Sequence, residues 1–494
     1  MIAIAGGGPN GLMLACELAL AGERPVVLER LTERSQEPKA NGMVGQVVRL
    51  LHQRGLLRRL GGGDVPFRAP GFFFGMLPLD LSGLEDNPLT ILPVPQRRLE
   101  QVLEERALEL GVEIRRGHEV AGLTQHDRGV DVEVTGPQGK YALNAEFLVG
   151  ADGGRSTVRK LAGIDFPGVS TEKGVNRAAH VTLPGLVDGQ LEVPGFGRIP
   201  PGVHTRTEHG VFLHIELEPG KPLVVTIEWD AVDDGPMTLD DLRQSVRRVL
   251  GADVPIGPPA GDGPHLLRRL SGGNSRIAEK YRSGRVFLIG DAAHVHSANG
   301  GPGLNLGLQE AANLGWKLAA HRQGWAPEDL LDTYETERRP AAERVVMHTQ
   351  AQSALAGPGP EVTALREFFA ELMTKVDVAG HIALTMAGSD IRYRTGTDHP
   401  LAGRFLPDIG EIGGLRDARP VLLDFARNTA LKDIADGWRD RVDVVELAWD
   451  ERLADVVLVR PDGYVAWAGD GVLSGLREEL AAWFGRPRTL TAVS

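Results

Sequence analysis

The sequence contains a single cysteine, Cys16, among its 494 residues. One thiol cannot form an internal disulfide, a zinc site built on several thiolates or a redox-active CxxC pair. No run of about eighteen apolar residues occurs, so we expect no membrane span. The first residues lack the basic stretch and apolar core of an export signal, so we expect a cytoplasmic protein. Cys16 falls within a helical pattern, and we interpret it as a packing residue.

Positive charge is also scarce, because 54 Lys and Arg stand against 66 Asp and Glu and give a formal net charge of -12. Nucleic-acid binding draws on clustered Lys and Arg, so we expect no nucleic-acid partner. With 42% hydrophobic and 24% charged residues, the composition is typical of a globular protein. A chain of this length predicts two or three domains.

The first 29 residues have the order strand, glycine turn, helix, strand, acid. Residues 2–5 predict a buried strand, residues 12–20 a helix, and residues 26–28 a second strand that ends at Glu29. The glycines of the intervening GxGxxG turn are Gly6, Gly8 and Gly11. Such glycines let the backbone approach a pyrophosphate, whose charge the helix start attracts, while the acid accepts from ribose hydroxyls. The pattern favours a dinucleotide site, and the alternative is a tight packing turn with a solvated Glu29.

Two later strands also end in an acid beside a glycine. The stretch FLVGADGG ends in Asp152 and Gly153, and FLIGDAA ends in Gly290 and Asp291, ahead of a glycine-rich turn at 300–303. An acid followed by glycine is common in loops, so each pair alone also fits a purely structural turn. Three such strand ends together fit one long cofactor lying across them.

The rest of the chain alternates between helical and strand-like patterns. Residues 171–270 alternate at period two, as in VFLHIELEP and LVVTIEWD, and predict a separate sheet. The other predicted segments are a helix at 99–110, short strands over 112–151, helices from 304 past 334 that end at Pro340, a helix at 361–386, a linker at 386–420 and a small α/β unit at the end.

With these motifs in this order, the sequence resembles the class A flavoprotein monooxygenases related to para-hydroxybenzoate hydroxylase, over roughly residues 1–345. The stretches VPQRRLEQVL, GADGGRSTVRKLAGIDFPG, LNLGLQEAANLGWKLA and LLDTYETERRP are similar to the antibiotic-tailoring branch, which includes anhydrotetracycline, angucycline and rifampicin monooxygenases. In the last unit, LVRPDGYVAW resembles the thioredoxin-like domain of that branch. Because this unit has no cysteine, it cannot exchange disulfides.

The resemblance implies an α/β fold: a Rossmann-like FAD-binding domain, an inserted β-sheet substrate domain and a C-terminal thioredoxin-like domain. The expected divisions are 1–170 for the first part of the FAD-binding domain, 171–270 for the substrate domain, 271–395 for the second part with its helices, and 396–494 for the C-terminal domain.

The resemblance also implies FAD as cofactor, NAD(P)H as transient co-substrate, and O2 and a small aromatic molecule as substrates. The residues assigned to the cofactor are Gly6, Gly8, Pro9, Asn10, Gly11, Glu29, Arg30, Lys39, Gln96, Asp152, Gly153, Gly290, Asp291, Gly300, Gly301, Pro302, Gly303, Leu304 and Asn305. Among them, Asp291 is expected to accept from a ribityl hydroxyl, and the turn at 300–305 to lie against the pyrimidine edge of the flavin.

The expected activity is hydroxylation of a phenolic, polyketide-type natural product through a flavin C4a-hydroperoxide, with no side chain as nucleophile. The substrate candidates are Phe74, Ala298 and Asn299; for Phe72 to Phe74 the alternative is a place in the core. Where relatives carry proline, glutamine and arginine, this chain has Ala298, Pro302 and Lys39.

Several alternatives stay open at this point. A flavin oxidoreductase or epoxidase, or a rifampicin-type enzyme that inactivates an antibiotic, fits the same motifs, as does a scaffold of the Rab escort type without redox chemistry. The HxH pair of His294 and His296 fits a metal site or local hydrogen bonds, and we favour the latter because no third ligand is evident. The substrate, the oxidised carbon, any protein base, the nicotinamide preference and the oligomeric state are not encoded in these motifs.

Overall fold

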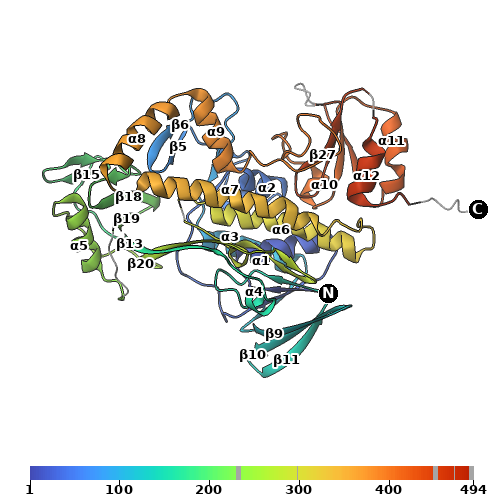
Figure 1. Ribbon diagram of the computed structural model, residues 1–494, viewed down its shortest axis with the longest axis horizontal. Coiled ribbons are helices and arrows are strands. Elements are labelled where there is room, and N and C mark those ends of the chain that lie inside the picture. The colour runs from blue at the N-terminus through green and yellow to red at the C-terminus, as the bar shows by residue number, and fades with distance from the viewer. Residues whose placement is uncertain (230–234, 298, 449–453, 472, 489–494) are drawn as a thin grey trace, which may run out of the picture.

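The computed structural model describes residues 1–229, 235–297, 299–448, 454–471 and 473–488. Three regions follow one another along its longest axis (Figure 1). A region of antiparallel strands lies at one end and a small C-terminal unit at the other, with a helix-covered central sheet between them.

The central sheet has six strands, in the order β21 (Arg282–Ser283), β22 (Val286–Leu288), β12 (Phe147–Gly150), β1 (Ile2–Ala5), β2 (Val26–Glu29) and β8 (Glu113–Arg116). Its strands pair in parallel except for β21, which runs antiparallel to β22. The residues of β1, β12 and β22 are all buried, which explains why these stretches read as continuous apolar runs. The helix α1 (Pro9–Leu20) begins three residues earlier than predicted because Pro9 fits its first turn.

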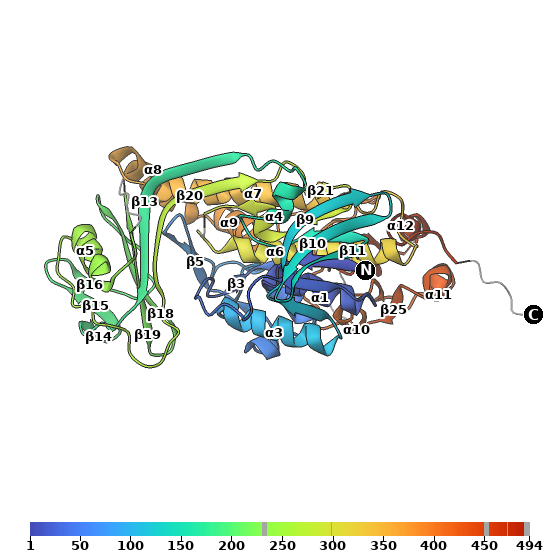
Figure 2. The ribbon, with the colours of Figure 1, turned by 90° about the horizontal axis from the view of Figure 1, so that it is seen from below.

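A second sheet carries the alternating segments. Its order is β17 (Thr205–Arg206), β18 (Gly210–Glu218), β19 (Lys221–Glu228), β13 (Gly168–His180), β20 (Leu267–Ile277) and β23 (His294–Val295), all antiparallel. The helix α5 (Leu239–Leu250) packs against one face and starts with a capping box between Thr238 and Asp241. The long strands β13 and β20 reach from this sheet towards the central region (Figure 2). Because β23 follows β22 after a turn of five residues, that turn joins the two sheets.

Smaller elements surround the central sheet. The helix α3 (Gln96–Glu109) follows Pro95, and the helix α4 (Thr157–Leu161) follows β12. A three-stranded antiparallel sheet packs at the lower edge, and a hairpin lies near the second sheet. The remaining elements are β3 (Met43–Val44), α2 (Gln46–Gln53), β4 (Phe67–Arg68), β5 (Gly71–Phe74), β6 (Leu77–Asp80), β7 (Thr90–Leu92), β9 (Glu119–His126), β10 (Gly129–Gly136) and β11 (Gly139–Ala145).

Long helices cover the region between the sheets. They are α6 (Pro302–Arg322), α7 (Thr333–Ala356), α8 (Pro360–Met373) and α9 (Val376–Ala387). The prediction that the helix ends at Pro340 is wrong, because α7 continues through that residue. Pro340 and Thr336, whose carbonyl loses its helical donor, are both exposed, so water can take the place of the missing N–H.

The C-terminal unit is a four-stranded sheet with the order β25 (Asp443–Glu446), β24 (Val421–Asp424), β26 (Val456–Val459) and β27 (Val465–Gly469), flanked by α11 (Ala430–Ala435) and α12 (Leu476–Phe484). The segment predicted as a linker has little secondary structure, but Tyr393, Phe405 and Leu406 are buried, so it is a packed connection. Arg460, after β26, pairs with Glu337 of α7 and fixes this unit to the central helices.

Candidate functional site

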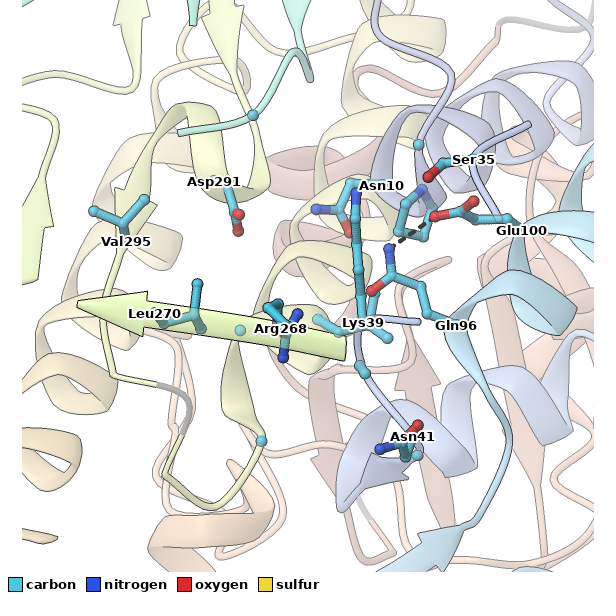
Figure 3. Close-up of a pocket in the computed structure, with 18 of the residues that line it drawn as sticks. Asn10, Ser35, Lys39, Asn41, Gln96, Glu100, Arg268, Leu270, Asp291 and Val295 are labelled. Carbon is cyan, nitrogen blue, oxygen red and sulfur yellow. Dashed lines mark hydrogen bonds between the residues drawn. The ribbon is translucent and has the colours of Figure 1, made fainter. Parts of the chain in front are cut away.

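A cavity of about 1200 Å³ opens between the central sheet and the second sheet. It is lined by the glycine turn after β1, the strand ends of β2 and β12, the turn before α6, and one face of β18 and β19. Figure 3 shows how some of the lining residues surround it: Asn10, Ser35, Lys39, Asn41, Gln96, Glu100, Arg268, Leu270, Asp291 and Val295.

The three glycines of the first turn, Gly6, Gly8 and Gly11, have different structural roles. A methyl group at Gly6 would lie 2.3 Å from the carbonyl oxygen of Ala151, and one at Gly11 would lie 2.0 Å from that of Gly6. These two glycines therefore let β1, β12 and α1 pack closely. A methyl group at Gly8 meets nothing within 4 Å, and Gly8 lines the cavity with Pro9. Gly8 is thus where backbone can approach a ligand.

Glu29 lies at the end of β2 and lines the same cavity. Its Oε2 accepts from the backbone N–H of Gly7 at 2.6 Å, and its Oε1 accepts from that of Leu31 at 2.8 Å. These bonds hold the carboxylate beside the turn, where its remaining lone pairs can accept from hydroxyls. Its neighbour Arg30 also lines the cavity.

Asp152 lines the cavity together with Gly153, but its carboxylate is engaged with the start of α4. It accepts from the backbone N–H groups of Thr157 at 2.7 Å and Val158 at 3.1 Å, and from the Ser156 hydroxyl. A carboxylate at a helix start is stabilised by the helix dipole. The geometry therefore gives Asp152 a structural task in addition to its place on the cavity wall.

Asp291 presents its carboxylate to the cavity, opposite Gln96 (Figure 3). No hydrogen bond to this carboxylate occurs among the residues that the structure describes. Burial raises its pKa above the usual value, against the opposing charges of His294 and Lys39. Its neighbour Gly290 does not line the cavity and packs against Asn10, which does. A carboxylate that faces the cavity without a donor is suited to a hydroxyl-bearing ligand.

The turn before α6 presents backbone to the cavity. Gly300 and Gly301 have φ of 78° and 67°, values that favour glycine. No side chain caps the helix, and Gly300, Gly301, Gly303 and Leu304 all line the cavity. Pro302 and Asn305 do not, since Pro302 is the first helical residue and the Asn305 amide bonds Gly301 and Val44 instead. An uncapped helix start can stabilise negative charge on a ligand.

Polar side chains cover the opposite side. The Nε2 of Gln96 donates to Glu100 at 2.7 Å, and Lys39 lies beside Arg268 of β20 (Figure 3). Burial raises the pKa of Glu100. The predictions from sequence included Gln96 and Lys39 but missed Arg268, because nothing in the local pattern of β20 distinguishes one of its arginines from another.

One face of the second sheet forms an apolar wall. The wall residues alternate along β18 and β19 with residues that face α5, such as Phe212 and Val224. The period-two pattern predicted two faces, but it could not tell which face meets the cavity. The wall consists of Val211, Leu213, Ile215, Leu217, Leu223, Val225 and Ile227.

Aromatic rings extend the wall at β5. Phe72 and Phe73 line the cavity, with ring centroids 4.6 Å apart and nearly parallel planes, and Phe73 meets the His204 ring edge-on at 4.7 Å. The prediction of Phe74 as a substrate contact is not supported, because Phe74 is buried against Phe369 on the other side of the hairpin. Asn299 lines the cavity. Ala298 lies outside the described residues.

The two histidines after Asp291 make local hydrogen bonds. The Nε2 of His294 lies 3.0 Å from both carboxylate oxygens of Glu310, and both side chains are fully buried. The Nδ1 of His296 lies 2.8 Å from the carbonyl oxygen of Ser297. Across the described ranges, no group of three or more His, Cys, Asp and Glu side chains is placed to hold a metal ion. Within the same ranges no helix has the length and apolarity to cross a membrane.

These features fit the chemical groups of an FAD molecule. The open backbone at Gly8, the acceptors Glu29 and Asp291, and the uncapped start of α6 lie along one cavity. They correspond to what a pyrophosphate, two sets of hydroxyls and an anionic ring edge require.

Comparison with known proteins agrees with this geometry. A family model described as "FAD binding domain" matches residues 1–349, and one described as "Aromatic-ring hydroxylase, C-terminal" matches residues 399–487. Anhydrotetracycline monooxygenase of Streptomyces rimosus is 42% identical, over 98% of this chain and 99% of its own. Rifampicin monooxygenase of Streptomyces venezuelae is 39% identical, over 98% of both chains. The solved structure of the anhydrotetracycline hydroxylase from Streptomyces rimosus, 40% identical, superposes with a TM-score of 0.86 over 99% of both chains.

Proposed function

The chain belongs to the FAD-dependent aromatic-ring hydroxylases, and from this premise we propose that it hydroxylates a phenolic, polycyclic compound of the polyketide type, with NAD(P)H and O2. The observation that carries the proposal is the continuity of the cavity. Residues that fit FAD at one side meet an apolar, partly aromatic wall at the other. A ring held against that wall lies next to the part of the cavity where the flavin ring would end.

We assign the cofactor contacts as follows. The backbone at Gly8 and the start of α1 bind the pyrophosphate, Glu29 binds ribose hydroxyls, and Asp291 binds a ribityl hydroxyl. The N–H groups at the start of α6 stabilise negative charge at the edge of the flavin ring. When bound, FAD takes electrons from NAD(P)H and, with O2, supplies the oxygen atom that the substrate gains.

The wall supports a large planar substrate. Its aliphatic side chains and the paired rings of Phe72 and Phe73 exclude water and stack on aromatic rings. Attack occurs at a carbon ortho or para to a hydroxyl, where a phenol carries most of its electron density. The names of the relatives support a polycyclic substrate, since anhydrotetracycline is such a phenol.

NAD(P)H shares the cavity with FAD in this proposal, because no second GxGxxG turn follows a strand in the sequence. Lys39, Arg30 and Arg268 supply positive charge for its phosphates. Substrate is expected to stimulate the slow oxidation of NAD(P)H by the free enzyme.

One rival role is inactivation of an antibiotic, which the 39% identity to rifampicin monooxygenase favours. A flavin oxidoreductase or epoxidase on the same fold is the other. An oxidoreductase differs from the proposal because it adds no oxygen to its substrate. The antibiotic-inactivating enzyme and the epoxidase also add one oxygen atom, and they differ in the compound or in the bond that receives it.

We also propose the domain divisions 1–170, 171–270, 271–395 and 396–494, with a thioredoxin-like C-terminal domain of structural purpose. The strand order β25–β24–β26–β27, with one parallel and two antiparallel pairs, supports a thioredoxin-like arrangement. Since the only cysteine is Cys16, the domain has no thiol chemistry.

The test is turnover of anhydrotetracycline with NADPH under ¹⁸O2, followed by mass spectrometry of the product. The expected product contains one ¹⁸O atom, and NADPH oxidation is faster with anhydrotetracycline than without it. An Asp291→Ala variant, expected to lose most bound FAD, serves as the negative control. A substrate that loses hydrogen without gaining label would contradict the hydroxylase assignment in favour of a dehydrogenase.

A further inference from the structure

Three imidazole rings line the described part of the cavity, and they lie in different surroundings. His118 precedes β9 and bonds the carbonyl of Arg116 through Nδ1. His204 lies beside Phe73 on the apolar wall. His296 is the one that lies next to the turn before α6, since a methyl group at Gly303 would come within 3.3 Å of its Cε1 and Nε2.

The hydrogen bonds of His296 determine which of its nitrogens can accept a proton. Its Nδ1 lies 2.8 Å from the carbonyl oxygen of Ser297 and can only donate to that acceptor. The neutral ring therefore carries its lone pair on Nε2. No partner for Nε2 occurs among the described residues, and Nε2 is not among the buried unpaired atoms, unlike Nδ1 of His294 and Nε2 of His348. An accepting nitrogen is thus available on a cavity-lining side chain.

The groups around His296 keep it neutral. Burial lowers its pKa to about 4, with further lowering from His294 and His348, while the bond to Ser297 opposes the shift. The His294 ring stacks at 6.1 Å and is itself paired with Glu310. Asp291, Lys39 and Arg268 are among the charged side chains that line the same cavity. The positive end of α6 beside Nε2 acts in the same direction, because it disfavours an imidazolium.

We propose that Nε2 of His296 accepts the hydrogen bond of the substrate's phenolic hydroxyl and takes its proton as the new carbon–oxygen bond forms. The proposal rests on the proposed function, because it requires a phenol as substrate. It names the protein base that the motifs of the sequence do not reveal.

The step balances without a further reagent. The O–O bond derived from O2 breaks: one oxygen atom forms a bond with the ring carbon ortho or para to the hydroxyl, and the other leaves as water, reduced by the two electrons of NAD(P)H. The O–H bond breaks, its electron pair becomes the carbonyl bond of a dienone, and the proton passes to Nε2. The dienone then loses the hydrogen of the attacked carbon and recovers the hydroxyl proton from Nε2, so His296 ends neutral.

A weak base is sufficient for this task. As the ring gives electrons to the incoming oxygen, the hydroxyl becomes far more acidic than a free phenol, whose pKa is about 10. A ring with a low pKa then takes the proton only when the bond forms, and it stays free of protons between turnovers.

The test uses the FAD-loaded protein and two conservative variants. In His296→Asn the side chain can keep its bond to Ser297, but it is too short to reach the position of Nε2. In His296→Gln an amide oxygen can accept a hydrogen bond near that position but cannot take up a proton. His209→Gln is the matched control, because His209 is exposed and outside the cavity.

The first measurement is binding of 1-naphthol and of its methyl ether, 1-methoxynaphthalene, followed by the change in flavin absorbance. Wild type, His209→Gln and His296→Gln should prefer the phenol by about 10-fold, the usual value of one hydrogen bond, and His296→Asn should lose this preference. No preference in wild type, or an unchanged preference in His296→Asn, would overturn the inference. It would mean that Nε2 faces the flavin or the wall instead.

The second measurement is the fraction of NADPH oxidation that yields ¹⁸O-labelled product from anhydrotetracycline, with the remainder released as H2O2. At pH 7 we expect His296→Gln to lower the rate of oxygen transfer about 100-fold, as for loss of a general base. Transfer should recover as pH rises towards the ionisation of the phenol, whereas wild type should show no such rise. A His296→Gln protein with wild-type yield, or a loss that pH does not repair, would overturn the inference. Absence of label in wild type would instead contradict the proposed function, and the naphthol preference would still report on His296.

Discussion

Asn10 lies so close to Gly290 that a methyl group on Gly290 would come within 2.0 Å of its Nδ2. The same amide would lie 2.4 Å from a methyl group on Gly307 of α6. Asn10 belongs to the first turn of α1, and Gly290 precedes Asp291. This contact therefore fixes the first glycine turn relative to the acid at the end of β22, two features that are 280 residues apart in the chain.

We expect Gly290→Ala to destabilise the protein by about 3 kcal/mol and to weaken FAD binding. Its φ of 60° costs roughly 1–2 kcal/mol for alanine, and the clash with Asn10 adds a similar amount from overpacking. Gly251→Ala is the control, because Gly251 has φ of 67° and open space around its Cβ, so it should cost only the backbone term. Urea unfolding of both variants measures the difference, and equal losses would argue against the contact.

Cys16 gives a second prediction. It is 2% exposed, its Sγ lies 3.5 Å from the Leu103 carbonyl oxygen, and burial raises its pKa to about 12. Because the thiol is buried and almost none of it is ionised at pH 8, the folded protein should not react with Ellman's reagent at that pH. In guanidinium chloride the unfolded protein should react with the reagent and release one equivalent of its coloured thiolate. Rapid reaction of the folded protein, or loss of turnover in a folded Cys16→Ser variant, would contradict a packing role.

A third prediction concerns the joint between the central helices and the C-terminal unit. Glu337 of α7 accepts from Arg460 at 2.5 and 2.8 Å and from Lys317 at 2.7 Å, all three being buried. Burial alone would raise the pKa of Glu337, but Arg460 and Lys317 outweigh it and hold it well below the usual value. Replacing one partner of such a group leaves an uncompensated buried charge, so Glu337→Gln should cost about 3–5 kcal/mol.

The pH dependence has a definite sign. The pKa of Glu337 is lower in the folded state than in the unfolded chain, so its stabilisation is complete above the unfolded value of 4.5 and is lost as pH falls below it. Thermal unfolding from pH 7 to pH 3 should show a smaller decrease in Tm for Glu337→Gln than for wild type. Glu343→Gln on the same helix is the control, since its pair with Arg339 is half exposed and should contribute less than about 1 kcal/mol. If Glu337→Gln and Glu343→Gln changed the pH dependence of Tm equally, Glu337 would not stabilise the contact between the central helices and the C-terminal unit.

The sequence predicted the parts of the site that local chemistry determines. The strand, turn and helix around Gly8 follow from a short apolar run, glycine and helical spacing, and Asp152 and Asp291 follow from their position at strand ends. Each of these signals lies within about ten residues. The prediction that the helix ends at Pro340 failed for the same reason. Whether water can reach the carbonyl that lacks a donor depends on the tertiary fold, which the local sequence does not show.

The side chains that face the substrate could not be predicted in the same way. Phe73 and Phe74 are neighbours on β5, and only the packing of Phe74 against Phe369 decides which one is turned from the cavity. Likewise, α5 decides that Phe212 is covered and that Leu213 is free to line the cavity. Such choices depend on contacts between separate elements of the fold, which no local pattern records.

The last prediction is that a substitution at Asp291 has opposite effects on the stability of the FAD-free protein and on its affinity for FAD. Burial raises the pKa of this carboxyl in the folded protein, so the folded state disfavours its charge. The stabilisation that a raised pKa provides is present below the unfolded value of 3.8 and is lost as pH rises through the folded value. At pH 7 the charge therefore destabilises the FAD-free protein, and Asp291→Asn should unfold at a higher temperature than wild type when both lack FAD. The same change should weaken FAD binding by roughly 10- to 100-fold, because a hydrogen bond to a charged acceptor contributes about 1.5–3 kcal/mol.

The comparison needs differential scanning fluorimetry of both FAD-free proteins from pH 4 to pH 8 and titration with FAD by fluorescence quenching. Asp329→Asn, at an exposed position outside the cavity, should change neither quantity. The Tm difference between Asp291→Asn and wild type should grow as pH rises, since only the wild-type side chain becomes charged. A variant that binds FAD as wild type does would remove Asp291 from the cofactor site. One that unfolds at a lower temperature at pH 7 would show that the carboxylate has a stabilising partner and is not kept free for a hydroxyl of the cofactor.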